Sequence, residues 1–450
     1  MPTARLSRRL KLLYSTGDLS TSAPLAIVAF FQFFFLTDVA GLRPDYAAWA
    51  VAAGRLWDAV NDPVFGLLSD RIRSRWGRRR VLLLFGAVPL GLCFGLLWLV
   101  PPLPPLALTV YYAVAFILFD TAYTAVHVGY NSLTPELTQD YDERSSLNGY
   151  RMVYSIGGAL GAIILATVLS WWITDQRLLY AALGLGLGLA AIVPPLIVFA
   201  VTRESAASAR PEQLPPWTAL KTTLGNRPFR MVMGLYLLSW TTASLLSAVL
   251  IYFANYYLRV PEQANYLVLT AQASAIVFVP VSVWLARRYD KRRAFMLGSG
   301  AWIAALLGIA ALPPDQVALA YGLAAASGLG IATAYVVPWA MVPDIIEHDQ
   351  LQTGERREGS YYAFIAFFQK LGTGAALWLM GQALAWAGYV TPAAGAALPE
   401  QPAAAVLAIR AFAGPVPAGL LVAAILFAWA YPLTRETHQA ALQELAGRGE

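Results

Sequence analysis

The sequence predicts an all-α polytopic membrane protein with twelve transmembrane helices, arranged as two pseudo-symmetric six-helix bundles. Of its 450 residues, 58% are hydrophobic and only 13% are charged, whereas soluble domains carry about 25% charged residues. Twelve apolar runs are separated by charged or Pro/Gly-rich stretches. Two motifs of the first half recur weakly in the second half, both at an offset of roughly 210 residues, as in transporters built from repeats.

Each apolar run can cross a bilayer, which takes about 20 mostly apolar residues. The runs lie near 12–37, 44–68, 80–100, 106–134, 147–172, 178–202, 228–258, 264–286, 294–312, 316–343, 359–388 and 409–433. The polar segment 203–227 separates the first six runs from the last six. We therefore expect an N-terminal bundle over 1–202, a cytoplasmic linker over 203–227, and a C-terminal bundle with a cytoplasmic tail over 228–450.

Lys and Arg indicate the orientation, because cytoplasmic loops of membrane proteins are enriched in both. Most of them fall in the N-terminal tail, the loops after even-numbered runs and the C-terminal tail, and Arg43, Arg177, Arg259 and Arg410 lie on the opposite side. This pattern predicts a multi-pass protein of the cell membrane with both termini in the cytoplasm, and we expect a monomer. It also explains the net charge of +6 without a nucleic-acid partner.

Several function classes are disfavoured. Cys93 is the single cysteine, and His127, His348 and His438 are too scattered for a zinc site. The sequence has no nucleophile constellation and no phosphate-binding loop, so we expect neither an enzyme nor an ATP-driven pump, and no organic cofactor. A channel or scramblase would need a continuous polar track, whereas the charges inside the runs cluster near mid-membrane.

The stretch RLWDAVNDP places charges inside the second run. Asp58, Asn61 and Asp62 stand at i, i+3 and i+4, so they share one face of a helix. Two carboxylates this close disfavour ionising together without a counter-charge, so a cation or a proton must accompany them. Their oxygens suit a small hard cation. The alternative is a structural salt bridge with Arg55 or Arg151.

A polar stripe runs along the fourth span, with Asp120, Thr124, His127 and Asn131 at helical spacings. The ring of Tyr123 beside it could stack on a solute while its hydroxyl forms a hydrogen bond. A stripe this regular on an otherwise apolar helix predicts a wall facing water or a ligand. The alternative is a polar seam that holds neighbouring helices together.

Three motifs, WDAVNDPVFGLLSDRIRSRWGRRR, LTPEL…DERSSLNGYR and PDIIEHDQLQTGERREGSYYAFIAFFQK, together resemble the glycoside–pentoside–hexuronide cation symporters, the melibiose-permease branch of the major facilitator superfamily. The resemblance runs from about Tyr14 to the end of the eleventh span. It implies symport of a sugar-like or glycoside-like solute with Na⁺ or H⁺ by alternating access. The implied cation ligands are Asp58, Asn61, Asp62 and Thr124. Without the cation, we expect Arg151 or Lys370 to supply the compensating charge.

The solute half of the site departs from that family. Two positions where sugar-transporting members carry aspartates hold Ser22 and His127 here, although Asp18 lies one turn before the first, and Asn131 replaces a tryptophan. The segment AVHVGYNSLTPEL is also similar to the animal sodium-dependent lysophospholipid symporter. An amphiphilic lipid as solute, Li⁺ as coupling ion and ion-independent uniport therefore stay open. The expected solute-binding residues are Asp18, Ser22, Tyr123, His127, Asn131, Arg151, Tyr154, Tyr335 and Lys370.

Charged residues at one end of the spans predict a cytoplasmic latch. Opposite charges there would pair when the inner gate is closed and separate when it opens. The expected gating residues are Asp70, Arg71, Arg73, Asp344, Glu347 and Arg356.

Overall fold

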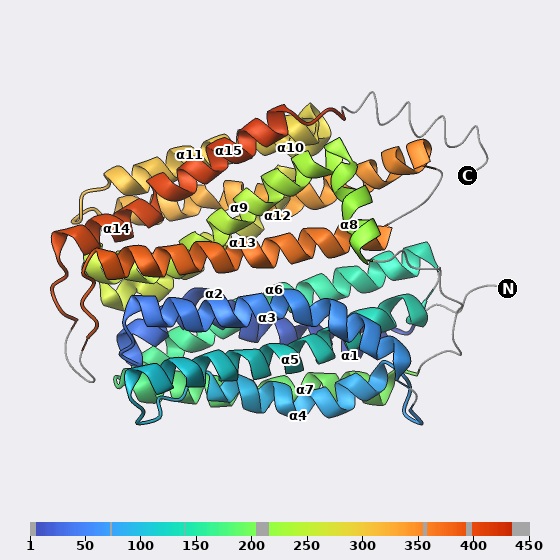
Figure 1. Cartoon of the computed structure of the whole chain (residues 1–450), viewed down its shortest axis with the longest axis horizontal. Coiled ribbons are helices and arrows are strands. Elements are labelled where there is room, and N and C mark those ends of the chain that lie inside the picture. Colours follow the sequence, from blue (N-terminus) through green and yellow to red (C-terminus); the bar gives the residue numbers. More distant parts are fainter. Residues whose placement is uncertain are drawn as a thin grey trace. The chain divides into compact units, whose positions relative to one another are not determined.

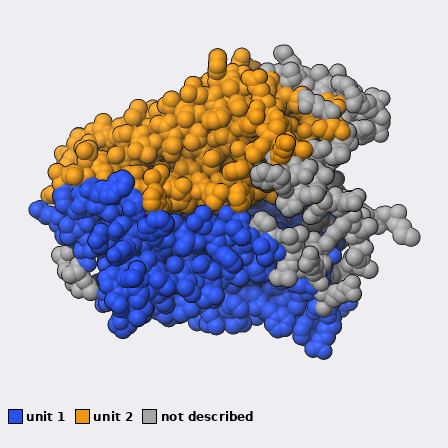
Figure 2. Space-filling view, in the orientation of Figure 1, with its two compact units in different colours: residues 1–209, 381–402 blue, residues 210–380, 403–450 orange. Residues whose placement is uncertain are grey.

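A computed structural model describes residues 6–72, 74–138, 140–203, 216–353, 358–392 and 398–433. Over these residues the chain is helical, and turns or short extended segments connect the helices (Figure 1). The chain divides into two compact units (Figure 2). Unit 1 comprises Met1–Ala209 and Gly381–Pro402, and unit 2 comprises Arg210–Met380 and Ala403–Glu450.

Unit 1 contains the first six spans. Proline opens two of the helices, and Asp140 and Asp175 cap two others by accepting a hydrogen bond from the first turn. The elements are α1 (Arg8–Ser15), α2 (Gly17–Phe34), the π-helical turn η1 (Phe35–Val39), α3 (Pro44–Arg71), α4 (Arg80–Leu96), α5 (Pro105–Leu137), α6 (Tyr141–Trp172) and α7 (Gln176–Val201).

Unit 2 holds the remaining spans, apart from the end of α13, which groups with unit 1. The helix α10 carries no charged side chain between Ala264 and Ala286. The elements are α8 (Pro216–Gly225), α9 (Arg227–Tyr252), the π-helical turn η2 (Phe253–Tyr257), the 3₁₀ turn η3 (Pro261–Gln263), α10 (Ala264–Tyr289), α11 (Lys291–Ala311), α12 (Val317–Thr353), α13 (Glu358–Trp386), α14 (Ala403–Ala413) and α15 (Pro415–Trp429).

Ten helical segments of the described chain are long and apolar enough to cross a membrane, by length and composition. The shorter apolar helix α4 and the helix α3, which carries Arg55, Asp58 and Asp62 in an apolar sequence, account for the other two expected spans. The prediction of an all-α, twelve-span membrane protein is therefore confirmed.

The two units share a detail of backbone geometry where their first spans end. The N–H group that follows each π-helical turn, of Ala40 in unit 1 and Leu258 in unit 2, donates to the carbonyl five residues earlier, at 2.8 and 3.0 Å. The next residue has a positive φ in both units, +78° at Gly41 and +57° at Arg259. The same local path thus occurs at corresponding places in the two halves.

Two close helix contacts bring polar side chains together in unit 1, where α3 packs along α5 and α2 along α6. Gly54 on α3 lies against the ring of Phe116 on α5, and a Cβ added at Gly54 would lie 2.0 Å from that ring. Gly158 on α6 faces Ser22 on α2, whose hydroxyl oxygen would lie 2.4 Å from an added Cβ. Because glycine lets helix backbones approach closely, short polar side chains can bridge these helices.

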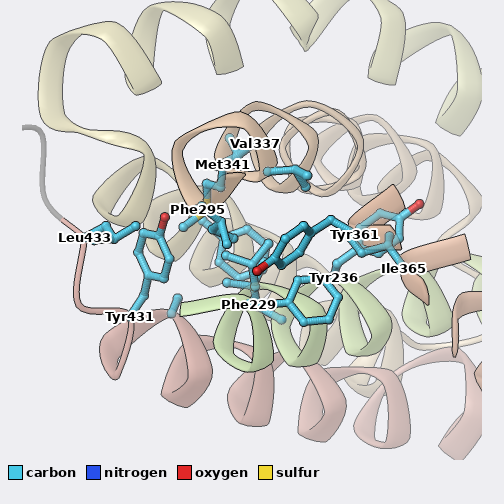
Figure 3. Close-up of a cluster of buried hydrophobic side chains, with 14 of the residues drawn as sticks. Phe229, Tyr236, Phe295, Val337, Met341, Tyr361, Ile365, Tyr431 and Leu433 are labelled. Carbon is cyan, nitrogen blue, oxygen red and sulfur yellow. The ribbon is translucent and has the colours of Figure 1, made fainter. Parts of the chain in front are cut away.

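Unit 2 has a buried apolar cluster formed by α9, α11, α12, α13, α15 and the chain that follows α15 (Figure 3). Phe229, Phe295, Met341 and Tyr361 are almost completely buried in it. Between helices that span a membrane, such side chains stabilise the structure through close van der Waals packing. This cluster therefore fixes the packing of the unit 2 helices.

Candidate functional site

Four polar side chains in the middle of α3 and α5 form a set that we call the α3–α5 oxygen group: Asp58, Asn61, Asp62 and Thr124. Asp58, Asn61 and Thr124 are buried, and Asp62 is partly buried. The Thr124 hydroxyl donates a hydrogen bond to Oδ1 of Asp62, at 3.0 Å. Since the three α3 members share one helix face, this bond ties that face to α5.

The side chain of Asn61 is held in one orientation by Asp120, which is itself buried. The Asn61 Nδ2 donates to the backbone carbonyl of Asp120 at 3.2 Å and to its Oδ2 at 3.3 Å. Two acceptors facing the amide fix which end is the NH₂ group. Oδ1 of Asn61 is buried and has no hydrogen-bond partner among the described residues.

One positive charge lies close to the group on the same helix. An Nη atom of Arg55 is 3.9 Å from Oδ2 of Asp58, three residues further along α3. The guanidinium also lies over the ring of Phe116, with its Cζ 5.5 Å from the ring centroid. Arg55 therefore compensates part of the acidic charge locally, which corresponds to one of the two salt bridges considered from the sequence.

The donor set suits a small hard cation. The hydroxyl of Thr124 and the amide of Asn61 both direct their hydrogens at carboxylates, so their oxygens keep lone pairs for a ligand. Carboxylate, amide and hydroxyl oxygens are hard ligands that favour cations such as Na⁺ over soft transition metals. Among the described residues, no three His, Cys, Asp or Glu side chains gather in an arrangement that could hold a metal ion.

A second polar set, which we call the α2–α6 hub, surrounds the ion pair between Asp18 on α2 and Arg151 on α6. The pair is bidentate: Nε and an Nη of Arg151 donate to the two carboxylate oxygens at 3.0 and 3.1 Å. The guanidinium also donates to Oγ1 of Thr134 at 2.9 Å and to Oδ1 of Asn131 at 2.6 Å. The ring of Tyr130 lies under it at 4.5 Å.

Two tyrosines complete the hub, Tyr14 on α1 and Tyr130 on α5. The Tyr130 hydroxyl donates to Oδ2 of Asp18 at 2.7 Å, and its oxygen lies 3.1 Å from the carbonyl of Tyr14. The Tyr14 hydroxyl lies 2.7 Å from the carbonyl of Tyr130 and 2.8 Å from Oγ1 of Thr134. Asp18 therefore accepts bonds from a guanidinium and a phenol, as a buried carboxylate requires.

The hub continues along α5 toward the oxygen group. Nδ2 of Asn131 is 2.8 Å from Nε2 of His127, and the His127 ring stacks on Tyr123 with centroids 5.3 Å apart. Thr124 of the oxygen group lies on α5 next to Tyr123. One helix, α5, thus carries side chains of both sets.

Arg151 has a different partner from the one expected. We expected Arg151 or Lys370 to compensate the acids of α3, but the structure pairs Arg151 with Asp18. The reason is that α6 packs along α2, so the guanidinium reaches the acid of that helix. Within α3, Arg55 is the basic side chain beside Asp58.

The other predicted solute residues are distributed over both units. Ser22 on α2 is next to Gly158 of α6, and Tyr154 is on α6 one turn before it. In unit 2, Tyr335 on α12 packs on Trp240 with ring centroids 4.9 Å apart. Lys370 is partly buried on α13.

The predicted latch residues are described only in part. Asp344 accepts from Nζ of Lys291 at 2.7 Å, so this pair joins α12 to α11 inside unit 2. A comparable pair in unit 1 joins Arg79 to Glu136 at 2.6 Å. Glu347 is partly buried near the end of α12. Outside the described residues lie Arg73, Arg356 and the side chains of Asp70 and Arg71.

Five contributors were not among the predicted site residues: Asp120, Tyr14, Tyr130, Thr134 and Arg55. Asp120 lies one helical turn before Thr124 in the stripe along α5, and this spacing was the available signal. Tyr14 and Thr134 give no comparable signal, because their roles depend on which helices meet.

Comparison with known proteins identifies the family of this chain. Residues 13–435 match the family described as MFS/sugar transport protein. The chain belongs to this family. The transporter is similar to an uncharacterised symporter of Synechocystis, with 34% identity over 97% of this chain and 96% of the relative. It is therefore a multi-pass membrane transporter, and its family comprises transporters rather than enzymes.

The transporter is also similar to a second curated protein and to a solved structure. The sodium-dependent lysophosphatidylcholine symporter 1-A of Danio rerio is 26% identical over 95% of this chain and 86% of its own length. A solved D-xylose–proton symporter superposes with a TM-score of 0.67 at 14% identity, over 94% of this chain and 97% of that one. At this identity the structural likeness supports the fold alone.

Proposed function

We propose that this transporter is a cation-coupled symporter in which the α3–α5 oxygen group binds Na⁺. The observation that supports this most directly is the orientation of Asn61 and Thr124. Both side chains direct their hydrogens at carboxylates, which leaves a buried amide oxygen and a hydroxyl oxygen beside two acids. A proton could neutralise the acids as well, but it would not use these two oxygens.

Coupling would run along α5, which carries residues of both polar sets. Cation binding between α3 and α5 would neutralise Asp58 and Asp62 and draw Thr124 into the coordination shell. Further along α5, Asn131 accepts a hydrogen bond from the guanidinium of Arg151. His127 contacts Asn131 and so reaches the hub through it. Typical coupling between two ligands is about 1–3 kcal/mol, and it is reciprocal. Solute binding would therefore raise cation affinity by the same factor.

For the solute, the hub favours an amphiphile with an anionic or zwitterionic headgroup. Asp18 is engaged by Arg151 and Tyr130, and the second acidic position of sugar transporters holds His127. A phosphate could take the place of the Asp18 carboxylate on the guanidinium, since Arg binds both groups in a bidentate manner. The names of several relatives, which are lysophosphatidylcholine symporters, support the same choice. A sugar-like solute is the second candidate, supported by the family description.

We also propose that the transporter resides in the cell membrane as a monomer with both termini in the cytoplasm. The distribution of Lys and Arg supports this orientation. Alternating access between two six-helix halves would then move the solute and the cation inward together.

The decisive test compares Asp58→Asn and Asp62→Asn with Asp45→Asn in proteoliposomes. We expect Na⁺-driven uptake of a labelled lysophosphatidylcholine to be abolished in the first two variants. Weak, ion-independent exchange should persist, because the hub is intact. Asp45 is the matched control, since it lies on the same helix in a surface pair with Arg43. Full Na⁺-dependent uptake by a folded Asp58→Asn protein would contradict this assignment, and equal wild-type uptake with and without an ion gradient would indicate uniport.

The solute class is tested separately with purified protein. A ligand that binds the folded state raises its apparent stability by mass action. We expect lysophospholipids to raise the melting temperature more in NaCl than in N-methylglucamine chloride, and a glycoside panel to leave it unchanged. Stabilisation by glycosides alone would reverse the choice between the two solute classes.

A further inference from the structure

The α3–α5 oxygen group depends on a residue outside it. Asp120 is buried on α5, four residues before Thr124, and it offers two acceptors to one amide group of α3. We propose that Asp120 is the positioning residue of the cation site, which holds Asn61 so that its amide oxygen faces the cation. This inference rests on the proposed cation coupling.

The orientation of Asn61 is a binary choice. An amide side chain can present either its NH₂ group or its oxygen to a given neighbour, and the two ends are nearly equal in shape. The backbone carbonyl and the carboxylate of Asp120 both accept hydrogen bonds, so only the NH₂ end is favourable toward them. Oδ1 of Asn61 is consequently directed elsewhere, into a position where no described residue donates to it. Since Asn61 is only 1% exposed, bulk water does not compensate this oxygen.

A buried amide oxygen without a donor costs free energy unless a ligand satisfies it. Coordination by a cation would satisfy it, and reversal of the amide would aim an NH₂ group at the cation instead. Asp120 thus acts on the cation through Asn61. Two side chains of α5, one turn apart, therefore act on neighbouring ligands of α3. Asp120 orients Asn61, and Thr124 donates a hydrogen bond to Asp62.

The test titrates Na⁺ into purified protein and follows thermal stabilisation at constant ionic strength, with N-methylglucamine as the replacement cation. Asp120→Asn should raise the half-saturating Na⁺ concentration by about 10- to 100-fold, the usual effect of removing a partner that orients a metal ligand. An asparagine at 120 can donate to Oδ1 of Asn61, which allows the reversed amide. Solute affinity at saturating Na⁺ and the melting temperature without Na⁺ should stay close to wild type.

Two further variants separate positioning from a distant charge effect. Asp120→Glu keeps the charge but moves the carboxylate, so positioning predicts weaker Na⁺ binding here too. In an Asn61→Ala background, Asp120→Asn should add almost nothing, because coupled residues are not additive. The inference would be overturned if Asp120→Asn weakened Na⁺ binding as much in the Asn61→Ala background as in the wild type. It would also be overturned if Asp120→Glu bound Na⁺ like the wild type, since only the charge at position 120 would then matter.

The matched control is Thr121→Ala. Thr121 is the neighbour of Asp120 and accepts a hydrogen bond from the Trp57 indole at 2.8 Å, so it also joins α5 to α3. We expect its Na⁺ titration to match wild type. An unchanged titration in Asp120→Asn, with wild type responding to Na⁺, would refute the positioning role alone. No Na⁺ response in wild type would refute the proposed cation site itself, and this inference with it.

Discussion

Asp18 and Arg151 form an ion pair whose hydrogen-bonding capacity is largely satisfied. The side chains are 12% and 16% exposed, and the guanidinium has partners on α2 and α5 besides the ring of Tyr130. Burying two charges is expensive, and their attraction repays the cost only when geometry is good and further hydrogen bonds are made. This pair meets both conditions, so the loss of Arg151 and the loss of Asp18 should destabilise the protein by different amounts.

We therefore expect Arg151→Gln to destabilise the protein by about 3–5 kcal/mol, the usual cost of leaving one partner of a buried pair. Asp18→Asn should cost less, because Arg151 would keep Asn131, Thr134 and the Tyr130 ring. The measurement is thermal unfolding in detergent, with the double variant completing a cycle. Arg43→Gln is the control, since its surface pair with Asp45 should contribute only about 0–1 kcal/mol. Equal effects of Arg151→Gln and Arg43→Gln would disprove a stabilising hub.

At the scale of single elements, the paired π-helical turns η1 and η2 impose a left-handed backbone on the residue two positions beyond each turn. Unit 1 places glycine there, and unit 2 places Arg259. A left-handed conformation costs an L-residue with a side chain roughly 1–2 kcal/mol. The geometry is thus kept in unit 2 at an energetic cost that unit 1 avoids.

This difference gives a direct test. Gly41→Ala should lower the free energy of unfolding by about 1–2 kcal/mol. Gly186→Ala, within α7, should leave it unchanged or raise it by up to about 1 kcal/mol, since alanine favours a helix. Both glycines have open space where a Cβ would be added, so the two variants differ in backbone conformation and not in crowding. Similar melting temperatures for both variants would count against strain at Gly41.

The elements also show what a sequence can predict. Spans follow from local hydropathy, and Asp58, Asn61 and Asp62 share a face because helical periodicity is local too. The partner of Arg151 is not a local property. It depends on the contact of α6 with α2, where Gly158 meets Ser22. Likewise, the stripe along α5 contained Asp120, but only the packing of α3 against α5 reveals its bonds to Asn61.

For the whole molecule, the proposed orientation predicts which surfaces a membrane-impermeant maleimide can reach. In a Cys93→Ser background, Thr174→Cys lies between α6 and α7 and should react in intact cells. Thr222→Cys lies on α8, in the expected cytoplasmic linker, and should react only after permeabilisation. Both side chains are exposed, so accessibility depends on the side of the membrane. The opposite labelling pattern would invert the topology.

The second spans of the two units, α3 and α10, differ in the charges they carry. In unit 1, α3 follows the helix that ends in η1, and it carries Arg55, Asp58 and Asp62. In unit 2, α10 follows the helix that ends in η2, and it is free of charge from Ala264 to Ala286. On the proposed function, the chemistry for cation binding therefore lies in unit 1, and α10 offers no counterpart.

This difference between α3 and α10 bears on the number of Na⁺ ions per transport cycle and on the solute concentration ratio that the transporter can reach. A single cation site implies one Na⁺ per transport cycle. Moving one elementary charge through 100 mV supplies about 2.3 kcal/mol. For a solute without net charge, that work corresponds to an inside-to-outside concentration ratio of about 50, multiplied by the Na⁺ concentration ratio itself. A symporter with a second site in the other half would square this limit, so the number of cation sites sets the thermodynamic ceiling of uptake.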